Sequence, residues 1–157
     1  MTPRSALAPL AALAFALAAC TPAYIHLGSV TPASVKAGQS WVITRPAVAA
    51  QALDACARDT TASISGYWAP SRAQIDAMES RLAQLQPRIA APRASDRQYI
   101  GIESGGKRLI YINAFTLPDG SALDPSRAAI ASCNDDAGTW NALYDPQTGA
   151  FSNITSH

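Results

Sequence analysis

The strongest constraint on the fold is a pair of β-rich runs that two glycines separate. The runs cover residues 97–104 and 107–115, and Gly105 and Gly106 lie between them. Glycine adopts the positive φ angles of a two-residue hairpin turn at no steric cost. The pattern therefore predicts a β-hairpin.

The predicted hairpin carries apolar side chains on both faces. Its register places Glu103 opposite Arg108. Strand alternation assigns two apolar sets, with Ile100, Ile102, Leu109 and Tyr111 on one face and Tyr99, Ile110 and Ile112 on the other. Such a strand pair belongs in the middle of a sheet, and one face is expected to receive a helix.

A helix is predicted between Pro70 and Pro87. Ser71 and Gln74 have the spacing of a capping box, in which each side chain bonds the other residue's backbone N–H. The helix should end before Pro87, because a residue that precedes proline disfavours the helical conformation. An apolar stripe at helical spacing follows the start and consists of Ile75, Met78, Leu82 and Leu85. This stripe needs a sheet to pack against.

A second hairpin is predicted from residues 140–144 and 150–155, which flank a turn at residues 145–149. Three of its aromatic side chains are expected to form a wall of the core rather than a ligand platform: Trp140, Tyr144 and Phe151. Four further segments are a short strand at 41–44, a short helix at 48–58, a loop at 116–127 and a strand or turn at 128–133. The expected fold class is α+β, with one main helix packed on an antiparallel sheet of about four to five strands built from two hairpins.

The first 20 residues have the composition of a secretory signal. Arg4 precedes fourteen uncharged and mainly apolar residues, 6–19, and Cys20 follows. This run is short for a spanning helix and contains Pro9, which disfavours a retained membrane anchor. Residues Leu17-Ala18-Ala19-Cys20 resemble the lipobox of bacterial lipoproteins. An ordinary secretory signal that contains a cysteine is the alternative.

The lipobox resemblance implies cleavage after residue 19 and attachment of lipid to Cys20. Several acyl chains anchor a protein firmly, because each buried CH₂ contributes about 0.8 kcal/mol. Thr21 follows the cysteine where Asp retains Gram-negative lipoproteins at the inner membrane, so the resemblance implies the periplasmic face of the outer membrane. The expected organisation is a signal peptide at 1–19, a lipid-attached tether at 20–47 and one α+β domain at 48–157.

Cys56 and Cys133 remain as an even pair once Cys20 carries lipid. In an oxidising compartment a disulfide is the simplest use of two thiols, and we expect one here. It would close a loop of roughly 78 residues and contribute on the order of 4–5 kcal/mol in the chain-entropy model. A redox or metal-binding thiol pair is the alternative, but the sequence has neither a CxxC spacing nor a nearby histidine to support it.

Charge is balanced overall but segregated along the chain. The chain has 12 Lys+Arg and 11 Asp+Glu, and this net charge of +1 gives no footprint for nucleic acid. Residues 81–108 hold six basic and two acidic side chains, whereas residues 119–145 hold one basic and five acidic side chains. Two interpretations stay open. The two segments are neutralised or solvated, or the acidic segment forms a face for a basic partner.

Few residues are available for catalysis. His26 lies in the expected tether and His157 is the last residue, so neither sits on a rigid framework for catalysis or metal ligation. No phosphate-binding or dinucleotide-binding glycine motif is present, and no cofactor is expected. Asp135 and Asp136 are the best candidates for a carboxylate-based hydrolase or a calcium site, although the spacing of a calcium loop is missing. We expect a protein that is not an enzyme.

Five segments carry a second resemblance: Cys56-Ala57-Arg58, Trp68-Ala69-Pro70-Ser71, Tyr99-Ile100-Gly101-Ile102, Tyr111-Ile112-Asn113-Ala114-Phe115 and Tyr144-Asp145-Pro146-Gln147-Thr148-Gly149-Ala150-Phe151-Ser152-Asn153. Together they resemble small proteobacterial lipoproteins to which no activity is assigned. The resemblance covers most of residues 56–153, supports one domain and implies no catalytic role.

Residues Ser104-Gly105-Gly106-Lys107-Arg108, with Tyr111 nearby, distantly resemble the Ser-Gly loops that periplasmic lysozyme inhibitors insert into their targets. The resemblance implies a partner-binding loop, and a plain tight turn is the alternative. From the sequence we expect a lipid-anchored, non-enzymatic binding or accessory module of the envelope, whose partner is another envelope protein. An inhibitor or immunity-type lipoprotein against a lysozyme-like, peptidoglycan-degrading enzyme is the alternative.

Overall fold

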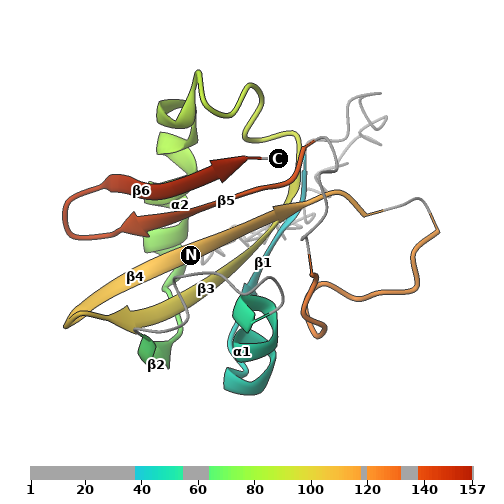
Figure 1. The fold of residues 1–157 in the computed structure, drawn as a ribbon, viewed down its shortest axis with the longest axis horizontal. Helices are drawn as coiled ribbons and strands as arrows, with labels where there is room; N and C mark the ends of the chain where they lie inside the picture. Colours follow the sequence, from blue (N-terminus) through green and yellow to red (C-terminus); the bar gives the residue numbers. More distant parts are fainter. Residues whose placement is uncertain (1–37, 55–63, 118–119, 132–137, 157) are drawn as a thin grey trace, which may run out of the picture. The chain divides into compact units, whose positions relative to one another are not determined.

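The structure is a computed structural model that describes residues 38–54, 64–117, 120–131 and 138–156 (Figure 1). All of them belong to one unit of the chain, Pro32–His157. The elements, in chain order, are β1 (Ser40–Ile43), α1 (Pro46–Asp54), β2 (Ile64–Trp68), α2 (Arg72–Arg81), the 3₁₀ helix η2 (Leu82–Leu85), β3 (Asp96–Ser104), β4 (Lys107–Phe115), β5 (Trp140–Asp145) and β6 (Ala150–Ser156).

The β3–β4 hairpin is the middle of one six-stranded sheet. It pairs with Glu103 opposite Arg108, as the sequence predicts. On one side β4 pairs with β5, and β5 pairs with β6, which forms the second predicted hairpin. Both hairpin turns lie at the same end of the sheet (Figure 1).

The other edge of β3 is shared by two short strands. β1 runs parallel to β3 along Arg97–Ile100, and β2 runs antiparallel to it along Gly101–Ser104. The sheet is therefore mixed, and it has more strands than the four or five antiparallel strands that the sequence predicts. β1 corresponds to the short strand expected at residues 41–44. β2 has no counterpart in the prediction, because a five-residue segment with Gly66 at its centre carries little strand signal.

Gly101 allows β2 to lie against β3. A Cβ at this position would come within 2.2 Å of the backbone oxygen of Trp68 and 3.0 Å of Cδ of Pro70. Neither group is at the flexible end of a side chain. Only glycine is therefore compatible with this close approach of two backbones.

Helix α2 begins with the predicted capping box. The hydroxyl of Ser71 accepts from the N–H of Gln74 at 3.3 Å, and the side-chain oxygen of Gln74 accepts from the N–H of Ser71 at 2.8 Å. The helical run extends to Leu85, before Pro87 as expected, but its last turn is the 3₁₀ helix η2. All members of the apolar stripe are buried: Ile75, Met78, Leu82 and Leu85.

Two apolar clusters lie on opposite faces of the sheet. α2 and η2 pack on the face that carries Tyr99, Ile110 and Ile112. α1 packs on the face that carries Ile100, Ile102 and Tyr111. The expected short helix thus packs on the sheet face opposite α2, and the prediction of one main packed helix is incomplete. Aromatic side chains from the second hairpin belong to the α2 cluster, as predicted: Trp140, Tyr144 and Phe151.

Residues 120–131 form no helix or strand, and polar groups of the sheet hold them in place. Gln98 and Asn113 lie opposite each other in β3 and β4 and are fully buried. The Gln98 amide donates to the backbone oxygens of Pro125 and Ala128, both at 2.7 Å, and the Asn113 amide donates to Ile130 O at 2.9 Å. The segment 128–131, expected as a strand or turn, is therefore a loop that is bonded to the sheet.

Candidate functional site

The turn of the β3–β4 hairpin is fully exposed and depends on its glycines. Gly105 and Gly106 have φ angles of 56° and 74°, and a Cβ at either would meet nothing within 4 Å. The requirement for glycine is therefore conformational rather than steric. The two turn residues have no side chains, and Lys107 and Arg108 are the first large exposed side chains after the turn.

Arg108 is positioned by two neighbours. Its Nε donates to Oε1 of Glu103 across the hairpin at 3.1 Å. Its guanidinium carbon lies 5.7 Å from the ring centroid of Trp68, the geometry of a cation–π contact. The side chain of Arg108 nevertheless keeps 65% of its surface exposed. An exposed cation with a restricted conformation loses little entropy on binding, and arginine is enriched at protein interfaces.

Strand β2 supports this arginine through hydrogen bonds to β3. Nε1 of Trp68 donates to the backbone oxygen of Ile102 at 3.0 Å, which fixes the indole ring. Oγ of Ser65 donates to the backbone oxygen of Glu103 at 3.2 Å. This support could not be predicted from the sequence, because β2 itself was not predicted.

The β5–β6 turn lies beside the β3–β4 turn and contributes Asp145. One oxygen of its carboxylate accepts from the N–H groups of Gln147 at 2.8 Å and Thr148 at 3.3 Å. The bond from Gln147 lowers the pKa of Asp145 most, and the bonds from Thr148 and the charge of Lys107 add to the effect. We call the exposed and partly exposed residues of the two turns, 104–108 and 145–148, the tip surface.

At the tip surface, the charge of Lys107 in the basic segment acts on Asp145 in the acidic segment. Within the described ranges, the other ion pairs of these segments are formed elsewhere: Arg97 with Glu79, Arg108 with Glu103 and Arg127 with Asp124. Each of these three pairs stays within its own part of the chain, and Asp119, Asp135 and Asp136 lie outside the described ranges. Asp124 also accepts two hydrogen bonds from Ser126, and these bonds lower its pKa.

A buried polar cluster joins β3 to α2. Nε of Arg97 donates to the hydroxyl of Tyr99 at 2.8 Å, and that hydroxyl donates to Oε1 of Glu79. Burial is the main cause that raises the pKa of Tyr99. Arg97 is only 4% exposed. Its position in a basic segment of the sequence gave no sign that its side chain would be buried.

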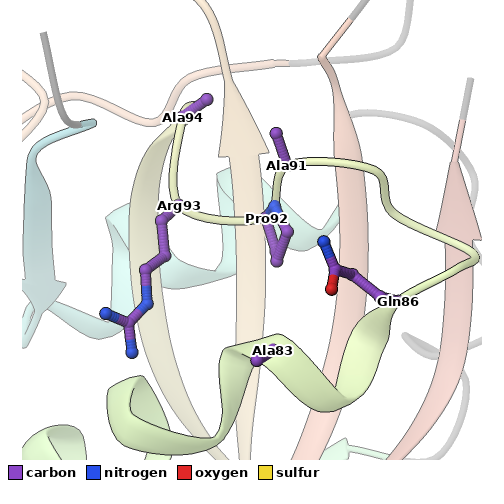
Figure 2. A pocket seen from close by; sticks show the side chains of 6 residues that line it. All are labelled: Ala83, Gln86, Ala91, Pro92, Arg93 and Ala94. Atoms are coloured by element: carbon purple, nitrogen blue, oxygen red, sulfur yellow. The ribbon is translucent and has the colours of Figure 1, made fainter. Parts of the chain in front are cut away.

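A small hollow lies between η2 and the segment that follows it (Figure 2). Its volume is about 190 Å³, and Ala83 and Gln86 line it from one side while Ala91, Pro92 and Ala94 line it from the other. The Gln86 amide donates to the backbone oxygen of Ala90 at 2.8 Å. Three alanines supply methyl groups to its lining, and Arg93 at its edge donates to the backbone oxygen of Glu79 at 2.8 Å. This arrangement provides no group for catalysis.

Several predicted residues lie outside the ranges that the structure describes: Cys20, Cys56, Cys133, Asp135, Asp136, His26 and His157. Lipidation, the disulfide and the carboxylate pair thus stay predictions. Within the described ranges no three His, Cys, Asp or Glu side chains form a group that could hold a metal ion. In the same ranges, every helix is too short or too polar to cross a membrane.

No protein-family model, curated protein or solved structure matches the chain.

Proposed function

We propose that the chain is a lipoprotein of the bacterial envelope. Cys20 carries the lipid, and Thr21 favours the periplasmic face of the outer membrane. The support is the lipobox sequence at the end of an apolar run of the correct length. Intact-mass spectrometry of the native protein tests this, because the mass of a chain that begins at an acylated Cys20 differs from that of any other processed form.

The same measurement tests the proposed Cys56–Cys133 disulfide, which lowers the mass by two hydrogens. Cys56 follows α1 in the sequence and Cys133 precedes β5, and both lie outside the described ranges. Free thiols in the native protein would contradict it.

We propose that the domain is a non-enzymatic binding or accessory module whose contact surface is the tip surface. The observation that carries this proposal is Arg108, which is exposed yet held between Glu103 and the ring of Trp68. Since Lys107 and Gly106 are also exposed, a partner can reach the whole turn. The expected partner is another envelope protein.

Affinity capture from envelope extract with the full chain tests this proposal. The Arg108→Ala variant should lose a stoichiometric partner that the native chain retains. Arg72→Ala is the matched control, because Arg72 is also an exposed arginine with a carboxylate neighbour, Asp76 at 2.8 Å, but lies on α2. Equal capture by all three proteins would contradict a role for the tip surface.

The second candidate is inhibition of a lysozyme-like enzyme. It is favoured by the exposed glycine turn between Ser104 and Lys107, whose geometry allows insertion into a groove. Under this proposal Ser104→Ala, or a bulky residue at Gly106, abolishes inhibition while the thermal unfolding of Ser104→Ala stays native-like. Unchanged inhibition by both variants would remove the turn from the mechanism.

A further inference from the structure

Strand β6 forms one edge of the sheet (Figure 1). Among the described residues, it pairs only with β5. The opposite edge is divided between β1 and β2, which have four and five residues, whereas β6 has seven. An open edge exposes unpaired backbone N–H and C=O groups, so it can pair with a strand of another chain. β6 is the longest strand exposed in this way within the part of the chain that the structure describes.

β6 lacks the side chains that usually protect such an edge. Natural edge strands carry charged residues, lysine above all, or proline, or they are very short. β6 consists of alanine, phenylalanine, two serines, asparagine, isoleucine and threonine, so it has neither charge nor proline. Antiparallel pairing of two β6 strands would bring no like charges together. A second copy of this chain is therefore a compatible partner for the edge.

One irregularity interrupts β6. Leu143 of β5 lies opposite Ser152 of β6. The next pair is Asn141 with Thr155, which leaves two residues of β6 facing one residue of β5, the pattern of a β-bulge. Asn153 lies in this bulge and is exposed. Its φ of 47° is the only positive φ of a non-glycine residue in the described ranges, and asparagine tolerates this conformation better than most residues.

The core does not need the extra residue. Phe151 and Ile154 are three positions apart, yet both pack on the α2 cluster, because the bulge returns them to one face of the sheet. Without Asn153 the two side chains would be two positions apart, and a regular strand would also place both on that face. The pairing with β5 would then be one to one. Placement of the core side chains is therefore not the role of the bulge.

We propose that the Asn153 bulge prevents β6 from pairing with the β6 strand of a second copy. A bulge increases the local twist of an edge strand and interrupts the regular spacing of its outward N–H and C=O groups. A second β6 strand then cannot form a continuous ladder with the first. This protection acts through the backbone, so the edge is protected without charge or proline.

Photo-cross-linking of the full chain in cells tests the proposal. The photoreactive residue p-benzoylphenylalanine replaces Thr155, which is exposed, and two copies paired through β6 then give a cross-linked dimer on a denaturing gel. Four chains are compared: the native sequence, the deletion of Asn153, the control Asn153→Gly, and the deletion combined with Ser152→Lys. Glycine retains the positive φ and thus the bulge, whereas lysine restores protection to a regular edge by its charge.

The deletion of Asn153 should form a dimer band that the native chain and Asn153→Gly lack, and Ser152→Lys should remove this band. No band from the deletion, a band of equal strength from the native chain or Asn153→Gly, or a band that persists with Ser152→Lys would each overturn the proposal. Thermal unfolding of the purified full chain is the second measurement. The deletion should still unfold cooperatively, and loss of folding would overturn the proposal, because the bulge would then be needed for packing.

Discussion

Nη2 of Arg97 in β3 lies 3.5 Å from Oε1 of Glu79 in α2, and the two side chains are 5% and 24% exposed. Both also bond the hydroxyl of Tyr99. Arg97 further donates to the backbone oxygen of Gly38 at 3.2 Å. One guanidinium thus links the helix on one face of the sheet, the central strand and the residues that lead into β1.

Replacement of Arg97 by Met should strongly destabilise the domain. It removes the cation that pairs with the partly exposed Glu79 and the donor to the Tyr99 hydroxyl and to several backbone oxygens, and each buried group left unpaired costs about 1–3 kcal/mol. Urea unfolding measures this effect. The control Arg72→Ala removes an exposed ion pair, with side chains 89% and 56% exposed, and should cost no more than about 1 kcal/mol. Similar losses in both variants would contradict the assigned role of Arg97.

Replacement of Gly101 by Ala should separate β2 from β3. The new Cβ would clash with the backbone oxygen of Trp68 at 2.2 Å, and forced overpacking costs about 1–3 kcal/mol or more. Gly66→Ala is the matched control in the same strand pair, since its Cβ would meet the end of the Glu103 side chain at 3.0 Å, which can move. Thermal unfolding should show a clearly larger loss for Gly101→Ala, and amide exchange should be faster in β2.

The elements predicted correctly are those with local signals. The capping box of α2, its apolar stripe and the Gly105-Gly106 turn each depend on residues within one or two turns of chain. Alternation along β3 and β4 was enough to assign both faces of the hairpin, since one residue of slip would exchange them.

What the sequence did not reveal depends on contacts between distant residues. β1 and β2 are short, and their positions on one edge of β3 follow from long-range pairing. Arg97 and Arg108 look alike in a basic segment, but one is buried among hydrogen-bond acceptors and the other is exposed at the tip surface. The supporting contact of Arg108 with Trp68 could not be predicted without β2.

Replacement of Gln98 by Met should release the loop at residues 124–130 from the sheet. The change keeps the size of the side chain but removes the donor for Pro125 O and Ala128 O, and the acceptor for the N–H of Ile130 at 3.2 Å. Each buried group left unpaired costs about 1–3 kcal/mol. Hydrogen exchange should therefore be faster at Ile130, whereas exchange in α2 should follow only the global loss of stability. Unchanged protection at Ile130 would show that the amide does not hold the loop.

The turn at Asp145 should make a contribution to stability that depends on pH. Its pKa lies below the ordinary value of 3.8, chiefly because the N–H of Gln147 bonds the charged form. A carboxylate whose folded pKa is lowered stabilises the fold above its unfolded pKa, and this contribution is lost as the pH falls through the folded pKa. Melting temperatures should therefore fall as the pH drops from about 4 toward the folded pKa of this group.

Asp145→Asn keeps an accepting oxygen but does not titrate, so the melting temperature of this variant should depend less on pH in this window. Lys107→Ala should raise the pKa of Asp145 toward its ordinary value. An NMR titration of the Asp145 carboxyl carbon measures that pKa directly, and a midpoint at or above 3.8 would contradict the assigned bonding.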